Sequence, residues 1–376
     1  MTDEGIPGLY IHIPFCRTKC HYCGFYSTTV FAQVPDFLQA IGKEMDFYRR
    51  DYDVFDTIYI GGGTPSALSV KDLAIILAGV ADKFSISSNA EITLEANPGD
   101  LSLPLLKDLR RLGINRLNLG IQSFADDTLD FLGRRHNRHQ AILAIELAHK
   151  AGFDNLGLDL IYGIPGQELA GWIDTLRQAL LFQPSHLSCY QLTMEPETPL
   201  AVRHSQGEIS LLDEERLADF FFQTATALDE AGYLHYEVSN FARDEASLSR
   251  HNQKYWQHTP YLGLGPAAHS FRDNKRWWNR RDVSRYIGDL KSDAAPLEAK
   301  EMLTPGQLRL EALFLGLRTK RGIDLENYRS RYGCNLLTEK HATIAFFIER
   351  GLLEVTANHL RPTLAGMAVA DSLALI

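Results

Sequence analysis

The sequence has no long apolar segment and no start that resembles a secretory signal. Its longest unbroken stretch of apolar residues and glycine is Leu73–Ala81, whereas a membrane-spanning helix needs roughly 20 such residues. The first residues, Met1–Gly5, include two acidic side chains, where a signal peptide would carry a basic start and then an apolar centre. We therefore expect a cytoplasmic protein without a transmembrane segment.

Basic residues are also too few for a protein that binds nucleic acid. The sequence contains 38 Lys plus Arg residues against 47 Asp plus Glu, which gives a formal net charge of −9. Because neutralising phosphates requires a concentrated basic surface, this balance argues against a nucleic-acid partner. Hydrophobic residues at 45% and charged residues at 23% are ordinary for a globular protein, and 376 residues are enough for two or three domains.

Short β-type runs alternate with helical patterns through the first half of the chain, which is typical of βα units around a parallel sheet. We expect strands near Leu9–Ile13, Thr57–Ile60, Glu91–Glu95, Arg116–Gly120, Leu156–Ile161 and His186–Tyr190. We expect helices near Asp36–Arg50, Val70–Lys83, Leu103–Leu112, Arg138–Ala151 and Glu168–Leu181. Six such repeats are compatible with an open doubly wound sheet or with a barrel, complete or partial.

The pattern changes beyond about Leu200. A helix near Leu212–Ala231 and a strand near Tyr233–Val238 precede a region rich in aromatic residues and glycine, and the segment near Asp293–Pro305 resembles a linker. Helices and then a hairpin, Leu352–Val355 with Leu360–Pro362, are typical of a winged-helix module. Its residues are not notably basic, so we expect it to pack or to dock a protein. We predict three parts: a core over 1–240, an extension over 241–300 and a C-terminal domain over 301–376.

Glycine and polar residues lie near the carboxyl ends of successive predicted strands: Gly61-Gly62-Gly63-Thr64, Glu95, Gln122 and Asp159. In barrels, that edge of the sheet builds the active site. Asp159 would point into a barrel interior, where a carboxylate needs a hydrogen-bonding partner. Either a neighbouring arginine or a ligand could provide that partner.

Only five cysteines are present, and three of them form a tight cluster. Cys16, Cys20 and Cys23 follow a C-x3-C-x2-C spacing in the loop after the first predicted strand. Three soft ligands so close together can surround one metal centre. Tetrahedral zinc would require a fourth ligand, for which His12 and His21 are candidates. A [4Fe–4S] cluster would use the three thiolates and leave one iron open, and three free thiols are the remaining alternative.

The cysteine spacing, followed by a glycine-rich strand end, resembles the radical S-adenosylmethionine (SAM) superfamily. Six segments resemble the subgroup around oxygen-independent coproporphyrinogen III oxidase and, most closely, the HemW family of haem chaperones. These segments are Tyr10–Cys16, Gly61–Ser66, Glu95–Gly99, Gly120–Phe124, Leu132–His136 and Asp159–Gln167. The resemblance implies an α/β fold: a partial (β/α)6 radical SAM barrel, followed by a smaller C-terminal domain with winged-helix-like elements.

The resemblance also implies cofactors. In this superfamily three cysteines hold a [4Fe–4S] cluster, and the open iron binds the amino and carboxylate groups of SAM. The metal ligands would be Cys16, Cys20 and Cys23. The SAM contacts would be Tyr10, Tyr22, Gly62, Gly63, Thr64, Glu95, Gln122, Arg134 and Asp159. No catalytic residue is assigned, and the number of SAM molecules and their turnover are left open.

Two segments favour a carrier over an oxidase. Oxidases of this group usually have a cysteine two positions after the third cluster ligand, whereas this chain has Phe25, as chaperone-like members have an aromatic residue. His251–Trp256 matches the H-N-x-x-Y-W motif of the HemW family, and imidazole is a good axial ligand for haem iron. His251 is therefore a candidate haem ligand, whereas Tyr255 and Trp256 could equally pack between domains. Cys189 and Cys334 are isolated, and we expect both to be inert.

We therefore predict a haem chaperone that binds a [4Fe–4S] cluster, SAM and haem. It would pass haem to acceptor proteins such as membrane respiratory enzymes, and we expect it to lack coproporphyrinogen oxidase activity. The alternative is the oxidase itself, or another radical SAM enzyme that acts on a tetrapyrrole. The sequence does not identify the acceptor or the electron donor, and it leaves a homodimer open.

Overall fold

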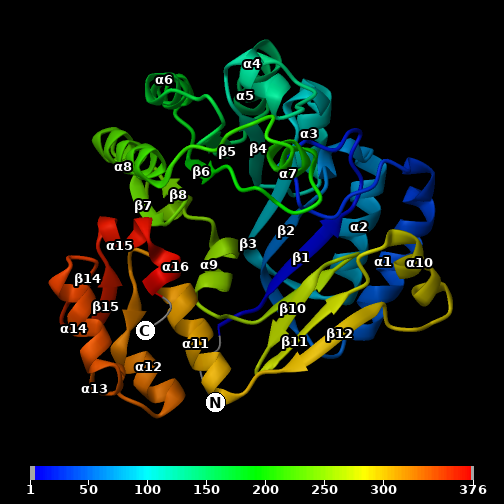
Figure 1. The fold of residues 1–376 in the computed structure, drawn as a ribbon. Coiled ribbons are helices and arrows are strands. Elements are labelled where there is room, and N and C mark those ends of the chain that lie inside the picture. The colour runs from blue at the N-terminus through cyan, green and yellow to red at the C-terminus, as the bar shows by residue number, and fades with distance from the viewer. Residues whose placement is uncertain (1–4, 374–376) are drawn as a thin grey trace.

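The computed structural model describes residues 5–373 and is organised around one large sheet (Figure 1). Within these residues the sheet has twelve strands in the order β12-β11-β10-β9-β1-β2-β3-β4-β5-β6-β8-β7. Met1–Glu4, on which the signal-peptide argument partly rests, lie outside the described residues. No helix in the described part of the chain is long and apolar enough to cross a membrane.

Six parallel strands form the centre of the sheet. They are β1 Gly8–Ile13, β2 Val54–Gly62, β3 Ser85–Ala96, β4 Arg116–Gln122, β5 Asn155–Tyr162 and β6 His186–Gln191. The connecting helices include α1 Val34–Tyr48, α2 Val70–Lys83, α3 Leu103–Arg111, α5 Arg138–Lys150 and α6 Leu169–Leu180. Five of the strands and these five helices match the predicted ranges within three residues, whereas β3 begins six residues before the predicted Glu91. Two short helices were not predicted, α4 Asp126–Phe131 and α7 Pro199–Ser205.

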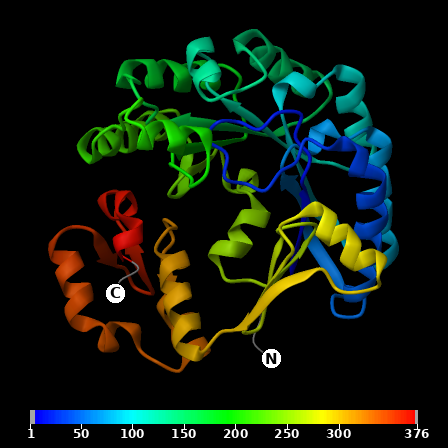
Figure 2. The ribbon, with the colours of Figure 1, turned by 45° about the vertical axis from the view of Figure 1, so that its right-hand side comes forward.

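Side chains alternate between the two faces of this central sheet, and the two faces differ in chemistry. Leu9, Ile58, Leu117, Leu158 and Leu187 are buried on the convex face, in the main hydrophobic core with the helices. The helices form an outer ring around the strands (Figure 2). The intervening positions are rich in polar residues and glycine, and they face the concave interior. This one-sided covering distinguishes the partial barrel from the doubly wound sheet, which the sequence left open.

Additional strands extend both edges of the sheet. On one side β9 Tyr261–Leu264 runs parallel to β1, and β10 His269–Arg272, β11 Lys275–Asn279 and β12 Leu297–Met302 continue in antiparallel pairs. On the other side β8 Asn240–Ala242 and β7 Leu234–Glu237 follow β6. The remaining helices of this region are α8 Glu214–Glu230, α9 Arg250–Trp256 and α10 Val283–Lys291.

The prediction of a linker near Asp293–Pro305 is wrong. Leu297–Met302 is the edge strand β12, which pairs with β11 through five residue positions. Along β12 partly buried and exposed residues alternate, because an edge strand presents one face to solvent and often carries charge there. The charged residues of this strand made it resemble a connection.

The C-terminal module has its own core. Its elements are α11 Pro305–Gly316, β13 Ile323–Asp324, α12 Leu325–Tyr332, α13 Leu336–Glu339, α14 His341–Glu349, β14 Leu353–Val355, β15 His359–Pro362, α15 Leu364–Ala368 and α16 Ala370–Leu373. Leu313, Tyr328, Ile344 and Leu360 are buried together in this second hydrophobic cluster. The hairpin β14–β15 lies where the sequence predicts it. The division into 1–240, 241–300 and 301–376 stays a prediction.

This module contacts the sheet near both of its edges. Near β7 the Val238 amide donates to the Arg318 carbonyl at 3.0 Å, and the Lys320 amide donates to the Tyr236 carbonyl at 3.0 Å. Near β11 the Arg276 guanidinium pairs with Glu311 of α11 at 2.6 Å. The module therefore lies in the gap of the partial barrel (Figure 2).

Candidate functional site

A cavity of about 590 Å³ opens at the carboxyl ends of the parallel strands. Most of the predicted site residues line it: Cys16, Cys20, Tyr22, Cys23, Gly62, Gly63, Thr64, Glu95, Gln122, Arg134 and Asp159. Two predicted residues are not among its lining. The Tyr10 hydroxyl instead lies 3.0 Å from His12 Nδ1, and His251 lies elsewhere in the concave interior.

The cysteine loop is closed by backbone pairing at its base. The Cys16 amide donates to the Thr28 carbonyl at 2.9 Å, and the Thr28 amide donates to the Pro14 carbonyl at 2.7 Å. The Thr64 hydroxyl donates to Cys16 Sγ at 3.2 Å. Burial raises the pKa of the Cys16 thiol, so a bound metal would be needed to favour the thiolate.

The two histidines that could complete a zinc site have other partners. His12 Nε2 lies 2.9 Å from the Tyr26 carbonyl oxygen, and burial lowers the pKa of His12 to about 4. His21 Nδ1 lies 3.0 Å from the Phe131 carbonyl oxygen. Neither histidine lines the cavity. Three thiols at a cavity that neither of these histidines lines favour a cluster with one open iron.

The glycine loop after β2 approaches the cysteine loop through its backbone. The Gly63 amide donates to the Ile13 carbonyl at 2.7 Å, and a Cβ at residue 63 would lie 2.8 Å from that same oxygen. Gly62 adopts φ 107°, and a Cβ there would lie 2.5 Å from His12 Nδ1. Only glycine fits at both positions, so the three-glycine segment brings Thr64 against Cys16.

Two partly buried carboxylates line the wall of the cavity. Glu95 accepts hydrogen bonds from the Tyr59 hydroxyl at 2.7 Å and from the Gly62 amide at 3.1 Å. Asp159 Oδ2 accepts from Asn118 Nδ2 at 2.7 Å. Burial, together with the charge of Asp159, raises the pKa of Glu95 to about 7, and burial also raises the pKa of Asp159. Both groups would be stabilised by a cation or a hydrogen-bond donor in the cavity.

Arg134 connects this wall to the cysteines. Its Nη1 donates to Cys20 Sγ at 3.3 Å, and its Nη2 donates to the Gly120 carbonyl at 2.7 Å. Gln122 adopts φ 66°, the left-handed region that non-glycine residues rarely occupy. Such strain is tolerated where the surrounding structure enforces it, often at a binding site.

Three buried polar atoms of the cavity have no partner within residues 5–373: Gln122 Oε1, Arg134 Nε and Asp159 Oδ1. Buried polar groups are normally hydrogen-bonded, so this concentration indicates a ligand that satisfies them. SAM carries an ammonium, a carboxylate and ribose hydroxyls, which can supply donors to the two oxygens and an acceptor to the guanidinium. The residues present therefore fit SAM.

Sequence reasoning missed several residues of the cavity. Tyr59, Asn118 and Tyr190 also line it, from β2, β4 and β6. Tyr190 lies on β6, where the sequence analysis identified no site residue. Tyr59 and Asn118 share strand parity with identified residues, since Tyr59 precedes Gly61 by two positions and Asn118 precedes Gln122 by four. The two-residue period of a strand could have found these two residues.

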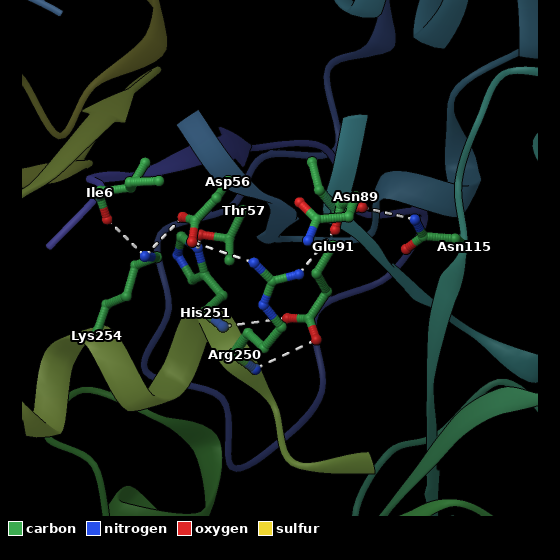
Figure 3. A network of polar contacts seen from close by, with 10 residues as sticks. Ile6, Asp56, Thr57, Asn89, Glu91, Asn115, Arg250, His251 and Lys254 are labelled. Carbon is green, nitrogen blue, oxygen red and sulfur yellow. Dashed lines mark hydrogen bonds and ion pairs between the residues drawn. The ribbon is translucent and has the colours of Figure 1, made fainter. Parts of the chain in front are cut away.

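His251 lies beside Thr57 of β2 (Figure 3), which pairs with Gly8 at the amino end of β1, whereas the cavity opens at the carboxyl ends of the strands. Its ring packs beside β2: Nδ1 lies 2.9 Å from Thr57 Oγ1, and Nε2 lies 2.9 Å from the Tyr255 hydroxyl. The side chain is 1% exposed, and burial lowers its pKa to about 3. Binding of haem iron by His251 would require one of these bonds to break, and its role as haem ligand stays a prediction.

Charged partners fix the helix that carries His251. Glu91 of β3 accepts the backbone amides of Arg250 at 3.2 Å and His251 at 3.1 Å, so its carboxylate lies at the amino end of α9. Arg250 and Lys254 pair with Asp56 at 3.1 Å and 2.7 Å (Figure 3). We name this group of Asp56, Glu91, Arg250, His251 and Lys254 the floor cluster. Sequence reasoning missed its two acids, because nothing local connects them to a helix so distant in the chain.

Comparison with known proteins agrees with this geometry. The sequence profile of the Radical SAM superfamily matches residues 10–179, and that of the HemN C-terminal domain matches residues 303–369. The heme chaperone HemW of Synechocystis sp. is 38% identical over 324 residues, which cover 84% of this chain and 78% of that protein. The heme chaperone HemW of Bacillus subtilis is 34% identical and is aligned over 92% of both chains.

A solved structure shows the same fold. The coproporphyrinogen III oxidase HemN from Escherichia coli superposes with a TM-score of 0.85 at 22% identity, covering 99% of this chain and 90% of that one. The predicted radical SAM barrel with a smaller C-terminal domain is thereby confirmed. Because relatives above 30% identity align with most of its length, the chain belongs to the radical SAM superfamily and, within it, to the HemW family.

Proposed function

We propose that this chain is a haem chaperone that holds a [4Fe–4S] cluster, SAM and haem, and passes haem to acceptor proteins such as respiratory enzymes. The observation that carries the proposal is the alignment, over most of the chain, with relatives named heme chaperone HemW. The cavity independently supports the cluster and SAM, since three thiols and polar atoms without a partner among residues 5–373 lie around one space.

Cys16, Cys20 and Cys23 would hold the cluster, which supplies the electron for reductive cleavage of SAM when both are bound. Glu95, Gln122, Arg134 and Asp159 would bind the polar groups of SAM, as their orphaned or acidic atoms suggest. The glycine loop, with Tyr22 and Thr64, would bring backbone and hydroxyl groups close to it. Tyr10 would act only through neighbouring residues, because it is not among the residues lining the cavity.

We also propose a cytoplasmic location, where a reducing environment keeps cluster thiols available. Membrane respiratory enzymes would be the acceptors, because haem is their cofactor. A homodimer would be compatible with transfer, although the chemistry described above needs only one chain.

The oxidase is the alternative function, and the shared fold with HemN is the observation that favours it. Phe25 stands where oxidases of the subgroup usually have a cysteine, which favours the carrier. One preparation of anaerobically reconstituted protein should be assayed both for haem binding and transfer and for conversion of coproporphyrinogen III in the presence of SAM and reductant. We expect haem transfer without conversion. Efficient conversion, or no binding of haem, would reject the chaperone.

A further inference from the structure

Phe25 is an aromatic side chain held in solvent at the mouth of the cavity. It lines the cavity and is 68% exposed. Tyr190, near the carboxyl end of β6, lines the same cavity and is 40% exposed. Exposed aromatic rings gain free energy when a flat ligand stacks on them, and apolar surface at the rim of a cavity commonly marks a binding site.

The backbone on both sides of Phe25 is fixed. Arg281 Nη2 donates to the Gly24 carbonyl at 3.3 Å. On the other side the Tyr26 carbonyl lies 2.9 Å from His12 Nε2, and the Tyr26 hydroxyl accepts the Val283 amide at 2.7 Å. Phe25 is therefore presented by an anchored loop, so little conformational entropy would be lost when a ligand covers its ring.

Two basic side chains lie at or next to residues that line the mouth of the cavity. Lys19 lines the cavity, and the guanidinium of Arg281 reaches the residue before Phe25. Neither forms an ion pair with any residue that the structure describes. The acidic side chain of Glu195 also lines the cavity, and it packs over Gly24. A planar ligand with carboxylates on one edge could place its ring on Phe25 and its carboxylates against the two cations.

The floor cluster offers no comparable surface for a planar ligand, since His251 is 1% exposed and both of its ring nitrogens are hydrogen-bonded. We propose that Lys19, Phe25, Tyr190 and Arg281 form the binding site for the haem cargo, with the porphyrin ring on Phe25 and the propionates on the two cations. We name these four residues the rim site. This inference rests on the proposed function and states where the haem cargo binds.

Binding titrations on the full-length chain with its cluster reconstituted would test the rim site. The probes are haem, metal-free protoporphyrin IX and the dimethyl ester of protoporphyrin IX, which lacks both carboxylates. We expect Phe25→Ser to raise the Kd for haem about tenfold and Phe25→Trp to keep it near the wild-type value. Arg281→Gln should raise the Kd about fivefold for the free acid and leave that for the ester unchanged.

Two variants serve as matched controls. Leu181→Ser removes an apolar side chain that is 75% exposed and does not line the cavity. Arg285→Gln removes a positive charge four positions from Arg281, in the exposed part of α10. Both should bind all three probes as the wild type does.

The outcomes separate the two proposals. Wild-type protein that binds no haem contradicts the proposed function itself. Haem binding that is unchanged in Phe25→Ser and Arg281→Gln, or weakened equally in the controls, overturns the rim site alone. Iron and sulfide are measured in every variant. If Phe25→Ser loses its cluster, the Kd values of Arg281→Gln for the free acid and for the ester decide whether the rim site binds haem.

Discussion

The concave face of the sheet carries two polar clusters that use their hydrogen-bonding groups differently. In the cavity, buried atoms of Gln122, Arg134 and Asp159 have no partner among residues 5–373. In the floor cluster both ring nitrogens of His251 and both carboxylate oxygens of Glu91 are bonded. Because an unpartnered buried polar group costs free energy, the cavity is arranged for a ligand and the floor for stability.

This difference predicts how each cluster responds to mutation. A change in the cavity should alter what is bound while leaving the fold stable. A change in the floor cluster should weaken the fold, because it leaves buried charges or amides without partners. Variants taken from each cluster can therefore test whether the cavity binds a ligand and whether the floor cluster stabilises the fold.

The largest effect is expected at the cysteines. Cys16→Ala, Cys20→Ala and Cys23→Ala should each abolish formation of a stable [4Fe–4S] cluster, because a cubane that keeps one open iron needs all three thiolates. Iron and sulfide content and the EPR spectrum after anaerobic reconstitution measure this. Cys189→Ala is the control, because that buried thiol is on the convex face with the hydrophobic core. A normal cluster in all three variants would remove these residues as ligands.

Glu91→Ala should lower the free energy of unfolding by about 3 kcal/mol. The change leaves two backbone amides at the start of α9 without an acceptor and removes a favourable charge from the helix terminus. Urea denaturation followed by circular dichroism measures the loss. Glu146→Ala, on the exposed face of α5, should change stability by less than about 0.5 kcal/mol. Equal effects of the two variants on the free energy of unfolding would contradict a structural role for the floor cluster.

The contribution of His251 to the stability of the fold should depend on pH. Its folded pKa is lowered from 6.5 to about 3, chiefly by burial and then by Lys254. The neutral ring therefore stabilises the fold fully above pH 6.5, and this contribution is lost as the pH falls toward 3. The groups around the ring are the hydroxyls of Thr57 and Tyr255, the Tyr59 ring and the Lys254 ammonium.

His251→Asn should thus destabilise the protein at pH 7, and the gap to the wild type should narrow by about 2 kcal/mol between pH 6.5 and pH 5. Unfolding free energies of both proteins across that range measure it. A gap that stays constant would mean that burial does not lower the pKa of His251 in the folded state. Haem affinity at pH 7 should be the same in both proteins if the cargo binds at the rim site.

Much of the cavity could be predicted from local patterns. The cysteine spacing, the glycine loop and the polar residues near strand ends, such as Glu95 and Asp159, lie together because parallel strands end at one edge. The floor cluster could not be predicted in this way. His251 meets Thr57 only because α9 packs into the sheet interior almost 200 positions later in the chain. A motif gives the residue types, whereas their partners depend on packing between distant segments.

The smallest effect, and the sharpest test of the cavity, is expected for Asp159→Asn. The amide keeps the shape of the side chain but loses the negative charge, so the affinity for SAM should fall about tenfold, or about 1.4 kcal/mol. Stability at pH 7 should stay equal or rise, because burial raises the pKa of Asp159 and makes its ionised form costly. Calorimetric titration with SAM and thermal unfolding measure the two quantities, with Asp154→Asn, exposed just before β5, as the control. A loss of stability without a loss of SAM affinity would place Asp159 with the floor cluster as a structural residue and would end the distinction between the two ends of the sheet.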